Sequence, residues 1–182
     1  MPFVGLHGEP LVVLASRALR AAGVALLGAD GESVRSAGAT LVVHDPLCPA
    51  TPVEFVREVL RVAESRGRAA VGVRPVTDTL KTSRRDAAPA TVLVGETVDR
   101  TTLLAVCSPL ALPYAVLSEL GDWPDPADCA GLGDLAVLVD LLGRDRPVEQ
   151  VPAPASARRV ADESDVRLLE VLTGPWLPSE QE

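Results

Sequence analysis

Four short groups of polar residues in this sequence have side chains that could do chemistry together. They are His44-Asp45, the run PVTDTLK at 75–81, the run ETVDR at 96–100 with the later Ser108, and the pair Arg158-Arg159. A carboxylate such as Asp45 can accept hydrogen bonds from a polyol hydroxyl or help to hold Mg²⁺. An arginine can grip a phosphate with two parallel hydrogen bonds. Each group alone could equally be a solvated charge cluster, or a loop cap in the case of Asp45.

Apolar runs around these groups predict the elements that position them. Short runs rich in Val, Leu and Ala predict buried strands at 40–43, 69–73, 91–94, 103–107 and 148–151. Apolar residues at helical spacing predict helices at 10–22, 51–66, 113–120, 134–142 and 164–172. Three of the polar groups lie where predicted strands end, and ligands of α/β sheets bind outside the carboxyl ends of strands. The sequence therefore predicts a ligand site at one edge of the sheet.

Length and composition indicate one α/β domain with a mostly parallel sheet flanked by helices. The 182 residues are 47% apolar but only 3% aromatic, so the core must be built from Val, Leu and Ala. That composition suits a buried parallel sheet better than an aromatic-rich barrel or sandwich. We expect a single domain over 1–182, with a frayed tail at 173–182.

Charge and cysteine content exclude several classes of function. The formal net charge of −8 argues against a nucleic-acid partner, which needs a basic face, but a few arginines suffice for a small phosphorylated ligand. The three cysteines are widely spaced and show no C-x-x-C, so we expect neither disulfides nor a zinc site. The apolar stretches are too short to span a bilayer. These features predict a cytoplasmic protein without membrane contact.

The order of the polar groups resembles one family. VHD at 43–45, PVTDTLK at 75–81, ETVDR at 96–100 and VCSP at 106–109 are similar to the motifs of the 2-C-methyl-D-erythritol 4-phosphate cytidylyltransferases. The resemblance extends over most of the chain. It implies a nucleotidyltransferase-like variant of the Rossmann fold and the transfer of CMP from CTP to a polyol phosphate, a step of isoprenoid precursor synthesis.

The resemblance also implies roles for individual residues. Arg100 and Arg159 would position the substrate phosphate for in-line attack. Thr79 and Ser108 would hydrogen-bond the substrate. Asp45 would bind substrate hydroxyls or lie near the nucleotide, and it is the candidate ligand for the Mg²⁺ that the family uses.

Two further expectations follow from the family resemblance. Asp134 matches an acidic, substrate-binding residue at the start of the penultimate helix. The segment 81–96 corresponds to an arm that reaches a second subunit, so we expect a homodimer through this segment. The alternative for 81–96 is an ordinary surface hairpin.

The chain departs from the family pattern at its start and near Asp45. The family begins with a strand and a Gly-rich loop that cradles CTP with an arginine and a lysine, and Met1 aligns with that lysine, so the fold should lack this strand and loop. Cys48 stands where the family has an arginine. Several interpretations therefore remain. The chain is a working or weakened cytidylyltransferase, or its true start lies upstream. Alternatively, it is a catalytically degraded member that binds a phosphorylated ligand or a partner subunit, or it is a structural α/β interaction domain.

Overall fold

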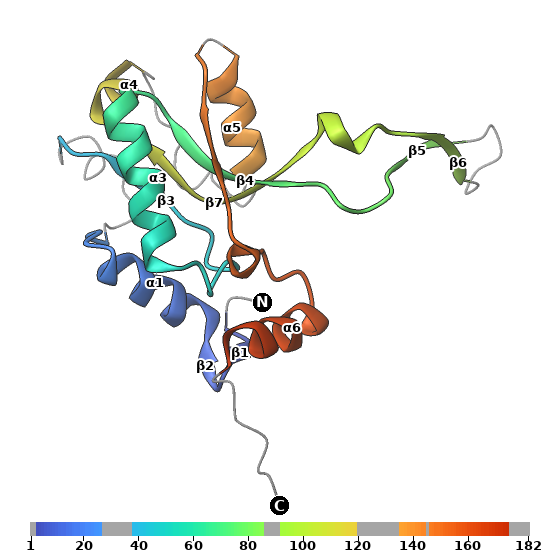
Figure 1. The fold of residues 1–182 in the computed structure, drawn as a ribbon, viewed down its shortest axis with the longest axis horizontal. Helices are drawn as coiled ribbons and strands as arrows, with labels where there is room; N and C mark the ends of the chain where they lie inside the picture. Colours follow the sequence, from blue (N-terminus) through green and yellow to red (C-terminus); the bar gives the residue numbers. More distant parts are fainter. Residues whose placement is uncertain (1–2, 27–37, 86–91, 120–134, 145, 175–182) are drawn as a thin grey trace, which may run out of the picture.

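A computed structural model of the chain describes residues 3–26, 38–85, 92–119, 135–144 and 146–174. These residues form an α/β fold with one main sheet, helices on both of its faces and a long hairpin that projects to one side (Figure 1). The predicted α/β class is therefore confirmed. The described helices include none long and apolar enough to cross a membrane.

The main sheet of the described residues has four strands in the order β3-β7-β4-β8. Their bounds are Leu41–Val43 for β3, Leu104–Leu112 for β7, Ala70–Pro75 for β4 and Glu149–Pro152 for β8. β3, β4 and β8 run in one direction, and β4 pairs with β8 in parallel. β7 lies between β3 and β4 and runs antiparallel to both.

Alternating side chains on the central strands build the two faces of the sheet. Ala70 and Ala111 face helix α3 (Val53–Arg66), which packs over them through Phe55 and Val59. The side chains next to these alanines along each strand, including Val71, point to the opposite face. There they pack against helices α4 (Tyr114–Glu119) and α5 (Leu135–Gly143). Successive side chains of a strand point to opposite faces, and here apolar residues lie on both, so helices bury the sheet on both faces.

The side chain of Phe55 on α3 packs closely over Gly72 of β4. A Cβ at this position would lie 2.9 Å from Phe55 Cζ and 3.0 Å from the Cys107 carbonyl oxygen. We therefore expect Gly72→Ala to lower the free energy of unfolding by about 1–3 kcal/mol through overpacking. Gly143→Ala is the matched control, because the described structure leaves the space around its Cβ open. Urea unfolding of both variants checks this, and equal stability of the two would contradict the close packing.

The predicted strand at 103–107 continues further than expected. The sequence places its end before Pro109, yet β7 runs to Leu112. Val71 pairs with Leu110 while the adjacent Gly72 pairs with Cys107, so two residues of β7 are left without partners on β4. A bulge tolerates proline, because its missing N–H is not needed in the ladder, and it redirects neighbouring side chains. This bulge contains Ser108.

A smaller apolar cluster holds the two ends of the chain together below the sheet. Strands β1 (Gly5–Leu6) and β2 (Glu9–Pro10) lead into α1 (Leu11–Ala21), and the cluster joins this region to α6 (Glu163–Thr173) (Figure 1). Val160, fully buried in this cluster, donates its N–H to the Leu47 carbonyl at 2.7 Å. The segment between the short helix η3 (Ala155–Ala157) and α6 is thereby fixed beside the loop after β3.

The projecting hairpin consists of β5 (Lys81–Arg85) and β6 (Val92–Thr97), which pair antiparallel. The predicted strands did not include β5, because its sequence is polar and its strand structure comes from cross-strand pairing with β6. The helix η1 (Arg100–Thr102) links the hairpin to β7. We call the described residues 76–85 and 92–103 the arm. Figure 1 shows it extending away from the main sheet.

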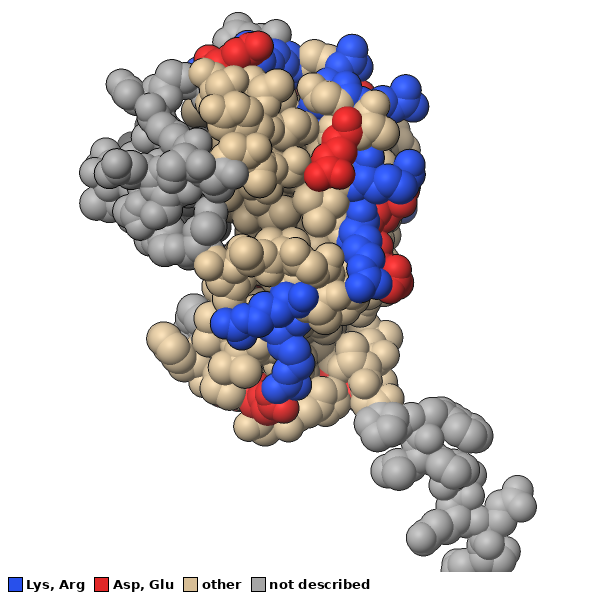
Figure 2. Space-filling view, turned by 90° about the vertical axis from the view of Figure 1, so that its left-hand side faces the viewer, with Lys and Arg blue, Asp and Glu red and all other residues tan. Residues whose placement is uncertain are grey.

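Arginines on the helices are largely neutralised by neighbouring acids. On the side of the molecule shown in Figure 2, acidic side chains lie next to basic ones. On α3, Arg57 pairs with Glu54 and Arg61 with Glu58, each at 2.6 Å and one helical turn apart. Such exposed pairs contribute little to stability, because water and salt screen them. These arginines solvate the helix surface and do not gather into an anion site.

Candidate functional site

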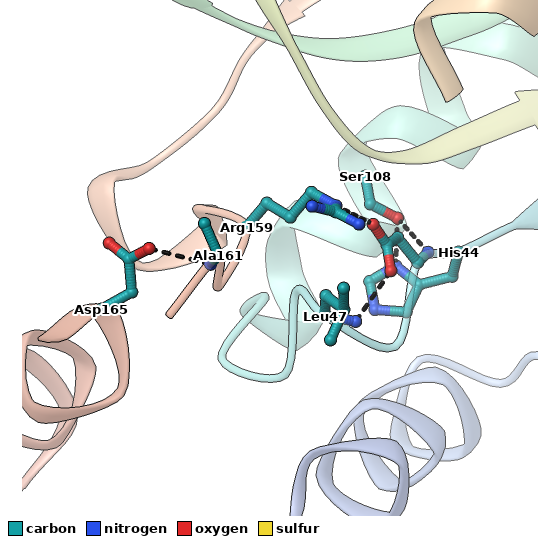
Figure 3. A network of polar contacts seen from close by, with 7 residues as sticks. His44, Leu47, Ser108, Arg159, Ala161 and Asp165 are labelled. Carbon is teal, nitrogen blue, oxygen red and sulfur yellow. Dashed lines mark hydrogen bonds and ion pairs between the residues drawn. The ribbon is translucent and has the colours of Figure 1, made fainter. Parts of the chain in front are cut away.

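A pocket of about 290 Å³ opens where the loop after β3, the bulge of β7 and the segment before α6 meet. Its polar residues are Asp45, Ser108 and Arg159. The remainder of the lining is Cys48, Val106, Leu135 and Ala136. Three residues predicted from separate parts of the sequence therefore line one pocket. Figure 3 shows two of them, Ser108 and Arg159, within one network of polar contacts.

Asp45 is held in place through its backbone and its carboxylate. Its Oδ1 accepts the backbone N–H of Leu47 at 2.8 Å, and its Oδ2 accepts Arg159 Nε at 2.7 Å. Its backbone N–H donates to Ser108 Oγ at 2.8 Å. Each carboxylate oxygen can accept a second hydrogen bond, so Asp45 can still receive hydroxyl groups of a ligand.

Arg159 is held by Asp45 through Nε alone. Its side chain is half exposed. Within the described part of the chain, both of its Nη groups lack hydrogen-bond partners. The flat edge of the guanidinium carrying the two Nη groups is therefore available to a phosphate. The neighbouring Arg158 pairs instead with Asp165 at 2.9 Å, and Asp165 also accepts the Ala161 N–H (Figure 3).

Ser108 lines the pocket beside Asp45 and contacts His44. The Ser108 hydroxyl is buried and lies 2.7 Å from His44 Nδ1. Burial lowers the pKa of His44 to about 4, although the nearby Asp45 carboxylate and the Cys48 backbone act in the opposite direction. At neutral pH the imidazole is therefore uncharged, which agrees with its sequence-based interpretation as a packing residue rather than a base.

Cys48 contributes an inert thiol to the pocket. Burial raises the pKa of this thiol to about 12, and the Asp45 carboxylate adds to the effect. A protonated thiol is neither a nucleophile nor a metal ligand. Where the related family has an arginine, this pocket therefore has a small, uncharged side chain, and Arg159 is its only cation among the lining residues.

The described residues do not form a complete Mg²⁺ site by themselves. None of their His, Cys, Asp and Glu side chains form a group of three or more that could hold a metal ion. Both Asp45 oxygens are engaged by protein donors. The expectation that Asp45 is a metal ligand thus gains no support, and we derive no step through a metal.

Two predicted substrate residues lie elsewhere in the molecule. Arg100 is exposed on η1 and donates through Nη1 to the Thr77 carbonyl, which ties together the two sides of the arm. Thr79 is also exposed on the arm. Arg100 is not among the residues that line the pocket with Arg159. It lies on the arm, which extends away from the main sheet (Figure 1). Asp134 lies outside the described residues; its neighbour Leu135 lines the pocket.

Comparison with known proteins identifies the family of this chain. Residues 13–173 match the family model of IspD, 2-C-methyl-D-erythritol 4-phosphate cytidylyltransferase. The chain belongs to the IspD family. The resemblance first indicated by four short motifs therefore extends over nearly the whole chain.

Individual IspD relatives match at moderate identity. The 2-C-methyl-D-erythritol 4-phosphate cytidylyltransferase of Saccharopolyspora erythraea is 31% identical over 164 residues, which cover 88% of this chain and 66% of that protein. The bifunctional enzyme IspD/IspF of Anaeromyxobacter dehalogenans is also 31% identical, over 88% of this chain and 39% of that protein. The chain thus spans less than two thirds of the length of these two curated relatives.

A solved structure extends the likeness to three dimensions. The crystal structure of 2-C-methyl-D-erythritol 4-phosphate cytidylyltransferase from Thermus thermophilus matches with a TM-score of 0.65 and 26% identity. The match covers 94% of this chain and 92% of that one. The IspD fold is therefore the fold of this chain.

Sequence reasoning missed two features of the IspD-like pocket. His44 was recognised but not connected to Ser108, which is 64 residues away in the sequence. Leu47 contributes through its backbone N–H, a contact that side-chain motifs do not reveal. The sequence did hint at the contact between His44 and Ser108, since the motifs VHD and VCSP both adjoin predicted strands. No local pattern, however, indicates that these two strands are neighbours in the sheet.

Proposed function

We propose that this chain is a cytidylyltransferase that transfers CMP from CTP to 2-C-methyl-D-erythritol 4-phosphate, with all 182 residues forming one domain. An oxygen of the polyol phosphate attacks the α-phosphorus of CTP and forms a phosphoanhydride bond. The bond from the α-phosphorus to the bridging oxygen breaks, and pyrophosphate leaves with the electron pair. The observation that carries the proposal is the cluster of Arg159, Asp45 and Ser108 in one pocket of an IspD-family chain.

Each polar residue of the pocket has a role suited to a polyol phosphate. The Nη groups of Arg159 bind the phosphate and hold it for attack. Asp45 accepts hydrogen bonds from the polyol hydroxyls, and Ser108 contacts an oxygen of the ligand. Their work is positioning and charge stabilisation, which supply most of the catalysis in transfers of this kind.

The non-enzymatic alternatives have no observation in their favour. The relatives described above carry the name of the active enzyme, alone or as part of a bifunctional one. A degraded ligand-binding member, a partner subunit and a structural interaction domain are each left without support. We therefore retain the enzymatic function.

The purified chain, supplied with CTP and 2-C-methyl-D-erythritol 4-phosphate, tests the proposal. We expect pyrophosphate release that depends on both substrates. Chromatography should detect the second product, in which a cytidine diphosphate group is attached to the polyol. Ribitol 5-phosphate serves as the comparison substrate and should react more slowly. If no pyrophosphate is released with either polyol phosphate, the proposed activity is contradicted. If ribitol 5-phosphate reacts faster, the proposed substrate is contradicted.

We also propose that the chain forms a homodimer through the arm. Val92 and Val94 are exposed on β6, and they lie two residues apart, so they share one face of the hairpin. An arm that leaves its own sheet and exposes valines is suited to pack against a second copy. In such a dimer Arg100 and Thr79 would act in the pocket of the partner copy, which would reunite Arg100 with an Arg159.

Val94→Glu is expected to convert the dimer into a monomer, because it places a charge in the proposed interface. Val171→Glu on α6 is the matched control, since Val94 and Val171 are 78% and 80% exposed. Light scattering after size exclusion gives the masses. A monomeric parent chain, or a dimer unaffected by Val94→Glu, would contradict this role of the arm.

Mixed dimers test the position of Arg100. Arg100→Ala and Arg159→Met should each be inactive alone. If one site uses Arg159 of one copy and Arg100 of the other, random mixing restores about a quarter of the sites, because half of the dimers are mixed and each has one intact site. Failure of mixing to restore any activity would place Arg100 outside the partner's pocket.

A further inference from the structure

The Ser108 hydroxyl is set between two nitrogen atoms at the wall of the pocket. The Asp45 backbone N–H donates to Ser108 Oγ at 2.8 Å, and His44 Nδ1 lies 2.7 Å from the same oxygen. The antiparallel register of β3 and β7 produces this arrangement, because Val43 pairs with Leu110 and the chain beyond Val43 continues alongside the bulge. One lone pair of Oγ is therefore occupied by Asp45, and the proton on His44 decides how the rest of the hydroxyl is used.

Two uncharged forms of His44 have opposite effects on Ser108. With the proton on Nε2, Nδ1 accepts the Ser108 hydroxyl hydrogen, and Ser108 can then only accept from a ligand. With the proton on Nδ1, the imidazole donates to Oγ, both lone pairs of Oγ are occupied, and the hydroxyl hydrogen is left for a ligand. The two forms therefore prefer chemically different ligand atoms.

Burial of the other ring nitrogen favours the second form. His44 Nε2 is buried and has no hydrogen-bond partner among the described residues. A buried N–H without a partner is rarer in proteins than a buried acceptor without one. The Cys48 carbonyl lies near the ring, but it already accepts the Thr51 hydroxyl at 2.9 Å and the Thr51 N–H at 3.4 Å. The proton is therefore better placed on Nδ1, where Ser108 Oγ receives it.

We propose that His44 is a positioning residue that donates from Nδ1 to Ser108 Oγ and so makes Ser108 a hydrogen-bond donor to the ligand. The inference rests on the proposed function for the identity of that ligand. A hydroxyl that receives two N–H donors is polarised and cannot accept further, so it must face an acceptor. In this pocket the acceptor is an oxygen of the polyol phosphate, while the donors on the polyol, its hydroxyls, are left to Asp45.

The tautomer can be read directly, without any assay of activity. The chain contains two histidines, His7 and His44, so a long-range ¹H–¹⁵N spectrum of the imidazoles at neutral pH has two sets of signals, and His7→Gln assigns them. We expect the protonated nitrogen of His44 to be Nδ1. A spectrum with the proton on Nε2 would overturn the inference, and it would do so whether or not the chain proves to transfer CMP.

Substitutions then separate positioning from simple packing. The amide nitrogen of His44→Asn can occupy the place of Nδ1 and donate to Ser108, whereas His44→Leu cannot. We expect His44→Leu to raise KM for the polyol phosphate about tenfold, the size of one hydrogen bond to a charged group, with KM for CTP unchanged. His44→Asn should restore KM to within about threefold of the parent.

A double variant completes the test. Ser108→Ala should raise KM for the polyol phosphate as His44→Leu does, and the combination should be no worse than either change alone, since both remove the same hydrogen bond. If His44→Asn folds normally yet is as impaired as Ser108→Ala, the inference is wrong. If His44→Leu does not fold, the Asn variant and the spectrum still decide.

Discussion

Replacing Arg159 with methionine is expected to lower kcat/KM for cytidylyl transfer about 100- to 1000-fold, the usual cost of removing one preorganised charged donor. Methionine keeps the length of the side chain but cannot bind the substrate phosphate. The free energy of unfolding should also fall by about 1–3 kcal/mol, because the change leaves the mostly buried Asp45 carboxylate without its charged partner, although Arg159 itself is half exposed. Steady-state kinetics with varied polyol phosphate, together with urea unfolding, measure both effects.

The adjacent arginine provides a matched control for Arg159. Arg158 faces away from the pocket, binds Asp165 at 2.9 Å and has a buried Nε. Arg158→Met should therefore lower stability by about 1–3 kcal/mol, since it leaves the mostly buried Asp165 carboxylate without its partner. Its kcat/KM at a temperature where it is folded should stay close to that of the parent. Equal losses of activity in the two variants would show that the pocket does not distinguish them and would contradict the assignment.

Acidification is expected to remove about 3 kcal/mol of stability through His44 alone. Its pKa is about 4 in the folded chain and 6.5 as the ordinary value, and each unit corresponds to about 1.4 kcal/mol. Because the folded pKa is the lower one, the unfolded chain takes up the proton first as the pH falls. The contribution is therefore complete above pH 6.5, declines as the pH falls toward about 4, and declines no further below that.

The His44→Asn variant isolates this contribution from that of the carboxylates. Urea unfolding of both proteins between pH 7.5 and about 4 should show the stability of the parent falling more steeply, by about 3 kcal/mol over this range. A difference between the two proteins that does not change with pH would mean that His44 is protonated as easily in the folded as in the unfolded chain, and that burial does not disfavour its charged form.

The local part of this fold is readable from the sequence. The strands at 41–43 and 70–75 and the helix between them follow from short apolar runs, a helical repeat and the left-handed Gly67 that ends α3. Asp45 and Ser108 both follow predicted strands, and the structure does bring them together. They meet because β7 continues antiparallel to β3 past Ser108, which places the loop after β3 beside the bulge, and not because two strands end at the same edge.

The position of Arg100 could not be derived in the same way. It follows β6 closely in sequence, and sequence proximity to a strand of the main sheet suggested that it reaches the common pocket. The direction in which a hairpin leaves the body is set by the bend after Pro75 and by what the arm packs against, and neither has a local signature. The family resemblance indicated an arm, yet the prediction placed Arg100, which lies on that arm, at the same site of one chain as Arg159. In the structure Arg100 does not line the pocket of Arg159.

The contact between His44 and Ser108 illustrates a second limit. It requires β7 to lie beside β3 in antiparallel register, with a two-residue bulge at Ser108 and Pro109. In the sequence the proline indicates the end of the strand, because proline usually interrupts a ladder. Only the three-dimensional pairing shows that the proline falls in the bulge, where a ladder N–H is not required.

Calorimetric titration of 2-C-methyl-D-erythritol 4-phosphate onto the purified chain tests the central claim most directly. If the pocket of Asp45, Ser108 and Arg159 is the phosphate site, the parent and Arg158→Met bind one ligand per chain, whereas Arg159→Met binds at least about tenfold more weakly, as expected for the loss of a charged hydrogen-bonding group. Binding of the same strength by all three proteins would show that the phosphate is held elsewhere, and the site described above would not be the substrate site.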